Sequence, residues 1–79
     1  MGGRIFLSDK EVACVLEVSV KSLYRMLRGF YIKGKVCGDR RLDIKSAAPT
    51  VVNGMRRWNI NRLARVLGVT PEEIEARVS

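Results

Sequence analysis

The sequence contains no histidine, and among its 79 residues there are only two cysteines and two prolines. Without histidine, the chain lacks the side chain that most often serves as a general base or a metal ligand near neutral pH. Cys14 and Cys37 have no zinc-ligand spacing, and both are expected to be reduced thiols. There is no glycine-rich phosphate loop, and no pair of carboxylates outside the acidic C-terminal segment. We therefore expect no enzyme, no metal site and no cofactor.

Long apolar runs are also missing, and no stretch is long enough to cross a membrane. Arg4 is followed by only three apolar residues, Ile5, Phe6 and Leu7, so the N-terminus lacks the apolar stretch of a signal peptide. A chain of this length makes one domain with a thin core. We expect a single domain over residues 1–79 that stays in the cytoplasm and has no membrane partner.

Acidic residues are scarce in the middle of the chain. The formal net charge is +7, and the sequence pI is about 10.1. Residues 21–65 hold twelve of the fifteen Lys and Arg but only two of the eight acidic residues, which gives this segment a net charge of +10. A surplus of this size implies a polyanionic partner, and the few aromatic residues argue against stacking on single strands. Double-stranded DNA is the expected partner. The alternative of another class is an RNA-binding module or an adaptor that meets an acidic protein.

Caps and apolar repeats predict the order of the secondary structure. Ser8 and Glu11 stand three apart, as in a capping box, and Ser19 is suited to begin a second helix. Thr70 and Pro71 mark the start of the last helix. The predicted elements are helices at about 9–16 and 20–28, a β-hairpin of about 33–37 and 40–44, a loop or arm at 45–55, and helices at about 60–67 and 71–78.

Two glycines are expected to end helices, Gly29 in a left-handed conformation. Gly29 follows the second helix, and Gly68 follows the third. Glu17 stands at a turn position that often holds glycine, which indicates a strained turn or a turn of another type.

Two segments of the chain resemble each other. Residues 12–19 align with residues 63–70, fifty-one positions later, and both patterns predict a helix-turn-helix. The helix after the first segment is cationic, whereas the helix after the second carries Glu72, Glu73 and Glu75. Because phosphate repels an acidic helix, only the first copy is expected to bind DNA. The second is expected to pack or to contact protein, including the basic face of another copy on the same DNA.

Three cations lie on one face of the predicted second helix. Lys21, Arg25 and Arg28 follow each other at spacings of four and three, with Ser22 and Tyr24 beside them. Long cationic side chains on a helix in the major groove pair with guanine edges or reach phosphates, and hydroxyls bind phosphate oxygens. The competing interpretation is a solvated helix face without a partner.

The helix pair and the segment after it resemble the excisionase-type winged helix-turn-helix, which is related in fold to mercury-resistance-type regulators. The similarity covers about residues 5–44, in the stretches Leu7–Ala13, Leu16–Ser19, Ser22–Leu27, Gly29 and Arg40–Ile44. It implies a fold that is mainly α with a small β-hairpin, namely a winged helix-turn-helix over 9–28 with a wing at about 33–44 and additional C-terminal helices. By position it implies DNA contacts from the second helix and the wing, at Lys21, Ser22, Tyr24, Arg25, Arg28, Lys35, Arg40 and Arg41.

The resemblance also implies a function. Proteins of this type prefer certain DNA sequences, bind cooperatively and bend DNA. They act as architectural recombination directionality factors, which assist site-specific recombination of a mobile element together with an integrase. Small transcriptional regulators of phages or mobile elements use the same domain, so the sequence leaves both roles open. Either role places the protein on the nucleoid.

The chain departs from that family after residue 44, because it continues for thirty-five residues. Either 33–44 forms a compact wing, or the wing is long and its return strand is Arg56–Ile60. The segment Arg56–Ile60 is itself predicted as a short strand or as the entry to the next helix.

The residues around that segment have more than one interpretation. Trp58 is expected to anchor the core rather than to stack on a base. Arg56 and Arg57 complete the set of candidate DNA-binding residues, and they are either surface charge or contacts to phosphate or a narrow minor groove. Val51 and Val52 are expected to cover the core rather than to wedge between base pairs, and contact with a neighbouring protomer is a further alternative.

Overall fold

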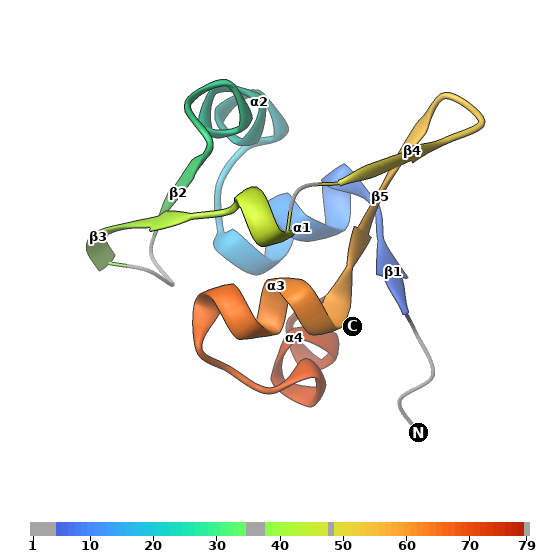
Figure 1. The fold of residues 1–79 in the computed structure, drawn as a ribbon. Helices are drawn as coiled ribbons and strands as arrows, with labels where there is room; N and C mark the ends of the chain where they lie inside the picture. Colours follow the sequence, from blue (N-terminus) through green and yellow to red (C-terminus); the bar gives the residue numbers. More distant parts are fainter. Residues whose placement is uncertain (1–4, 35–37, 48, 79) are drawn as a thin grey trace.

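The computed structural model describes residues 5–34, 38–47 and 49–78, which form an α+β fold (Figure 1). Within these residues there are four α-helices, five β-strands and one turn of 3₁₀-helix. The strands pair in two antiparallel sheets, one of three strands and one of two. In chain order the elements are β1 (Phe6–Leu7), α1 (Asp9–Leu16), α2 (Val20–Gly29), β2 (Tyr31–Gly34), β3 (Gly38–Asp43), η1 (Lys45–Ala47), β4 (Thr50–Val52), β5 (Met55–Asn59), α3 (Ile60–Leu67) and α4 (Pro71–Val78).

The expected fold class, mainly α with one small hairpin in a winged helix-turn-helix, is wrong. The segment 45–55, expected as a loop or arm, contains η1, β4 and the first residue of β5. β5 then pairs with β4 on one side and with β1 on the other, so the apolar lead-in before α1 becomes an edge strand. The β1–β5 pairing joins Leu7 to Trp58. A periodicity analysis of short windows cannot detect pairing between segments so far apart in the sequence.

The helices begin at the predicted residues, three of them at predicted caps. At the start of α1, the Ser8 hydroxyl accepts from the Glu11 amide at 3.2 Å, and the Glu11 carboxylate accepts from the Ser8 amide at 3.0 Å, which confirms the capping box. Side-chain oxygens cap the other three helices as well, those of Ser19, Asn59 and Thr70. α1, α3 and α4 have the predicted bounds, and α2 is one residue longer. In the described parts of the chain, none of the helices is long and apolar enough to span a membrane.

The two helix pairs, α1 with α2 and α3 with α4, share their turn geometry. Glu17 and Gly68 both adopt the left-handed conformation, with φ of 57° and 72°. In each turn the amide of the following residue donates to the carbonyl five residues earlier, at 3.0 Å in both copies. The similarity between residues 12–19 and 63–70 is therefore a structural repeat, and the strained turn predicted at Glu17 is confirmed.

The left-handed residue after α2 is Phe30, with φ of 53°, and not Gly29 as expected. Gly29 stays in the helix, and its environment explains why it is glycine. A Cβ at this position would lie 2.6 Å from Cε1 of Tyr31, far inside a van der Waals contact. Space rather than φ therefore requires glycine at position 29. Gly68 does end α3 as predicted.

β4 and β5 form a hairpin whose turn consists of Asn53 and Gly54. Both have positive φ, 53° and 80°, as a type I′ turn requires. The register pairs Val52 with Met55 and Val51 with Arg56. The alternative of a long wing with its return strand at 56–60 is wrong, because β5 belongs to the three-stranded sheet and β2 to the other one.

The compact hairpin predicted between 33 and 44 is present, although its strands begin two residues earlier. β2 and β3 pair Tyr31 with Asp43 and Ile32 with Leu42. Lys35, like Cys37, lies outside the described residues. Cys14 is an exposed free thiol on α1.

The core draws on every helix and on both sheets. Trp58 is its largest fully buried side chain, which confirms its role as a core anchor. The prediction for Val51 and Val52 is wrong, because these side chains are 65% and 49% exposed and do not cover the core. The other fully buried large side chains are Leu7, Val12, Val15, Leu16, Leu23, Ile32, Ile44, Ile60, Leu63 and Ile74.

Candidate nucleic-acid interface

The solvent face of α2 carries cations and no acid. Lys21, Arg25 and Arg28 are exposed, while Leu23 and Met26 anchor the opposite face in the core. The helix sequence contains three basic residues and no acidic one, so its exposed face has a net charge of +3. Burial on one side and charge on the other leave this face available to a polyanion.

Ser22 is hydrogen-bonded to Ser19, the N-cap residue of α2. Its amide donates to the Ser19 hydroxyl oxygen at 3.1 Å, and the Ser19 hydroxyl donates to Oγ of Ser22 at 3.0 Å. These two hydrogen bonds between uncharged groups cap the N-terminus of α2. The hydroxyl of Ser22 therefore helps to hold the first turn of α2, which contains Lys21.

Tyr24 connects α2 to the three-stranded sheet. The guanidinium carbon of Arg56 lies 4.8 Å from the centroid of the Tyr24 ring, in a cation–π contact. Tyr24 is 41% exposed, so one part of its ring meets solvent while another part meets Arg56. The contact brings two candidate residues together that are far apart in the sequence.

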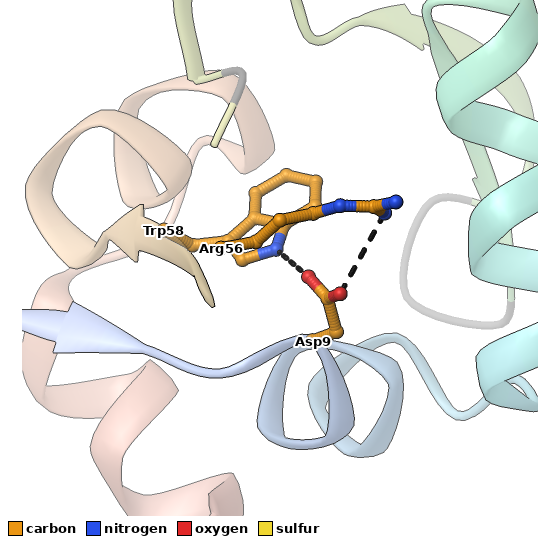
Figure 2. Close-up of polar contacts among 3 residues, drawn as sticks. All are labelled: Asp9, Arg56 and Trp58. Atoms are coloured by element: carbon orange, nitrogen blue, oxygen red, sulfur yellow. Dashed lines mark hydrogen bonds and ion pairs between the residues drawn. The ribbon is translucent and has the colours of Figure 1, made fainter. Parts of the chain in front are cut away.

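Asp9 also contacts Arg56, as Figure 2 shows. Nη1 of Arg56 lies 3.6 Å from Oδ2 of Asp9, and Nε1 of Trp58 donates to Oδ1 of the same carboxylate at 2.7 Å. Residues 56 and 58 lie on the same face of β5 because side chains alternate along a strand. The Arg56 charge, on a side chain that is 42% exposed, is therefore paired with a carboxylate and an aromatic ring of the same chain.

Arg57 lies on the opposite face of β5. Its side chain is exposed, and Nη2 lies 3.9 Å from Sδ of Met55, two residues earlier. The adjacent cations Arg56 and Arg57, which the sequence alone could not distinguish, thus have different surroundings. Arg56 joins three elements, while Arg57 points to solvent.

Two open depressions adjoin the Tyr24–Arg56 contact. One has a volume of about 430 Å³ and the other about 530 Å³, and both include Tyr24 and Arg56 in their linings. The first is lined in addition by Leu27, Arg28, Phe30 and Pro49. The second is lined in addition by Ser8, Asp9, Lys10, Val20, Gly54 and Met55. Open depressions with basic linings suit an extended polyanion better than a small enclosed ligand.

The predicted wing residues lie elsewhere. The guanidinium of Arg41 stacks over the Tyr31 ring at 4.8 Å from its centroid, on the β2–β3 hairpin. Arg40 lies in β3, next to Arg41. In Figure 1 this hairpin and the β4–β5 hairpin lie on opposite sides of the molecule. The candidate residues therefore form two groups, one on α2 and β5 and one on the β2–β3 hairpin.

Sequence reasoning missed the apolar and cationic neighbours of the first group. Phe30, Pro49 and Met55 line the depressions, and so does Lys10. The signal for the β4–β5 hairpin was present, because Asn-Gly after a run of β-branched residues is a strong indication of a type I′ turn. The position of Phe30 had no such signal, since it depends on the packing of the next residue against α2.

The acidic helix α4 lies at the other end of the molecule from α2 (Figure 1). Glu72 and Glu73 are exposed in its first turn, and Ile74 anchors it in the core. The thiol of Cys14 donates to the carbonyl oxygen of Arg77 at 3.7 Å, which joins α1 to the last turn of α4. The two copies of the helix pair thus present helices of opposite charge.

In comparisons with known proteins, no family model, no curated protein and no solved structure matches this chain. Its proposed function therefore rests on the residues and surfaces described above.

Proposed function

We propose that this protein binds double-stranded DNA with a sequence preference, that α2 enters the major groove, and that the β4–β5 hairpin lies over the neighbouring backbone. The observation that carries the proposal is the cationic face of α2, held beside β5 by the contact between Tyr24 and Arg56. A helix fits the width of the major groove, and cations on its exposed face meet both base edges and phosphates.

The cations on this surface have separate roles. Arg25, in the middle of the exposed face, is the candidate for a base contact, because bidentate pairing of Arg with guanine is the most common specific contact. Lys21 and Arg28, near the ends of α2, are candidates for phosphate contacts. Arg57 adds a phosphate contact from the hairpin, and Arg56 positions the hairpin against α2.

The biological role that we propose is that of an accessory factor in site-specific recombination of a mobile element, acting with an integrase on the nucleoid. Support for this finer role comes from the residues that resemble excisionase-type proteins. The exposed carboxylates of α4 would then contact the cationic face of a neighbouring copy on the same DNA. A small transcriptional regulator would use the same DNA-binding surface.

The proposal is tested by selecting bound sites from random duplex DNA and then titrating the selected site against a scrambled one. Arg25→Ala is expected to reduce the preference for the selected site by about 5- to 150-fold, the effect of losing one bidentate base contact. Arg65→Ala is the matched control, because it removes an exposed arginine from α3, in the other helix pair. It is expected to leave the preference unchanged.

Two results would contradict the proposal. If Arg25→Ala and Arg65→Ala behave alike, α2 does not read the DNA sequence. If single-stranded RNA competes with the selected duplex at every salt concentration, the protein belongs to the alternative class of RNA-binding modules.

A further inference from the structure

The tip of the β4–β5 hairpin is apolar and exposed. Val51, Val52 and Met55 are 65%, 49% and 56% exposed, and they flank the turn formed by Asn53 and Gly54. Turn tips usually carry polar side chains, because water surrounds them. Three large apolar side chains around one two-residue turn therefore need another explanation than packing within this chain.

The hairpin register arranges these side chains in a defined way. Val52 and Met55 face each other directly across the turn, on one face of the hairpin. Val51 pairs with Arg56 and lies on the other face. The type I′ turn fixes the pair without a flexible loop, and in Figure 1 the hairpin extends away from the helices. The apolar pair is thus presented on a short, ordered projection.

Cations lie directly behind the apolar pair. Arg57 follows Met55 on the same face, with its Nη2 atom 3.9 Å from the Met55 sulfur, and Arg56 lies on the opposite face. An apolar tip with a guanidinium on each face does not match a purely apolar protein surface. It matches a duplex, in which stacked bases lie between two rows of phosphates.

We propose that Val52 and Met55 form a wedge that enters the minor groove and inserts between neighbouring base pairs, while Arg57 contacts the flanking phosphate. This inference rests on the proposed DNA binding and adds a mechanism to it. Apolar wedges of this kind unstack one base step and kink the duplex by roughly 20–90° toward the major groove. The hairpin would therefore bend the DNA next to the site that α2 contacts.

The test uses the full chain and the duplex that it selects from a random pool. Fluorescent dyes at the two ends of the duplex measure bending by energy transfer, and 2-aminopurine placed in turn at each position measures unstacking. Wild-type protein is expected to shorten the end-to-end distance and to raise 2-aminopurine fluorescence at one base step only. Met55→Gln and Val52→Thr are expected to abolish both signals while the protein still binds the duplex.

Val51→Thr is the matched control. It makes the same change on the same strand, but on the face of the hairpin that lies away from the apolar pair. It is expected to keep the bend and the unstacking signal. All three side chains are exposed, so the variants are expected to melt at the wild-type temperature, which a thermal scan checks.

The outcomes separate this inference from the proposed function. Wild-type protein that binds the duplex without unstacking any base step overturns the wedge and leaves DNA binding in place. Wild-type protein that binds no duplex overturns both. If the protein sediments as a dimer without DNA and Met55→Gln converts it to a monomer, the tip is a self-association surface and the wedge is wrong.

Discussion

The indole Nε1 of Trp58 donates a 2.7 Å hydrogen bond to Oδ1 of Asp9, which lies 49 residues earlier at the start of α1. The second oxygen of the same carboxylate pairs with Arg56, and Arg56 lies over the ring of Tyr24 in α2. One carboxylate therefore contacts both the core tryptophan and Arg56 of the hairpin strand (Figure 2), and Arg56 in turn contacts the cationic helix. This arrangement connects the two parts of the candidate DNA-binding surface.

Substitutions of Asp9 separate its two contacts. Asp9→Asn keeps an oxygen that accepts from Trp58 but removes the charge that pairs with Arg56. We expect it to lower the free energy of unfolding by about 0.5–1.5 kcal/mol, because the ion pair is partly exposed and a first-turn carboxylate also favours the helix dipole. Asp9→Ala leaves the buried indole N–H without its acceptor, and we expect it to lower the free energy of unfolding by a further ~1–2 kcal/mol.

Urea denaturation of the two variants measures this difference, and near-ultraviolet circular dichroism reports the surroundings of Trp58. Equal stabilities of Asp9→Asn and Asp9→Ala would show that the hydrogen bond contributes nothing measurable. Asp43→Asn serves as a control for the loss of a carboxylate, since the Asp43 side chain is exposed and accepts a local bond from the Lys45 amide at 2.9 Å.

The structural repeat gives a second prediction about stability. Glu17 adopts a left-handed conformation with φ of 57°, and the equivalent position in the second copy is Gly68, with φ of 72°. Residues with a Cβ are strained in this conformation, whereas glycine is not. Glu17→Gly is expected to raise the free energy of unfolding by about 0.5–1 kcal/mol, and Gly68→Ala to lower it by about 1 kcal/mol.

Both changes are measured in the same denaturation series. No atom of the described residues lies within 4 Å of a Cβ built on Gly68, so the cost there reflects the backbone and not a clash. A loss of stability in Glu17→Gly would mean that the Glu17 side chain stabilises the turn by more than its strained φ costs.

Local signals in the sequence predicted the helices, but not the relations between elements. The caps at Ser8, Ser19 and Thr70 lie within three residues of their partners, and their helices begin as expected. The partner of Trp58 is 49 residues away, and no spacing rule connects the two. For the same reason Arg56 and Arg57 were equivalent in the sequence, although strand alternation places them on opposite faces.

The Asn53-Gly54 turn is a different case, because its signal is local, yet together with Pro49 it predicted a loop or arm at 45–55 instead of a hairpin. The β-branched residues before the turn gave the hairpin pattern, and the exposure of Val51 and Val52 shows that they do not serve the core. Exposed apolar residues are invisible to a pattern analysis that assigns every apolar side chain to the interior.

For Gly29 and Tyr31 we predict that a substitution of Tyr31 reverses the effect of Gly29→Ala on the stability of the protein. Alanine favours a helix over glycine by about 1 kcal/mol, yet at position 29 its Cβ would lie 2.6 Å from the Tyr31 ring. Gly29→Ala is therefore expected to destabilise the wild-type protein by about 1–3 kcal/mol. In a Tyr31→Ser background the ring is gone, and the same change is expected to stabilise the protein relative to Tyr31→Ser alone. Destabilisation in both backgrounds, measured by thermal melting, would show that the ring is not the obstacle.

Arg56 and Arg57 allow a test of DNA binding, since they differ in position but not in charge. Each cation that neutralises a phosphate contributes about 0.9 to the slope of log K against log salt concentration. Arg57 is exposed on the outer face of β5, so Arg57→Ala is expected to reduce the magnitude of the slope by about 0.9. It is also expected to weaken binding to all duplex sequences equally. Arg56 is already paired with Asp9, so Arg56→Ala is expected to change the slope by less than half as much.

The loss in Arg56→Ala should appear instead in the geometry of the complex. Without the contact to Tyr24 the hairpin is no longer held beside α2, and the bend measured between dyes at the ends of the duplex is expected to become smaller and more variable. Arg56→Lys keeps the charge but not the planar group that stacks on the ring, so it should resemble Arg56→Ala in bending and the wild type in slope. If Arg56→Ala instead reduces the slope as much as Arg57→Ala does, Arg56 contacts phosphate directly, and the pairing with Asp9 must open when DNA binds.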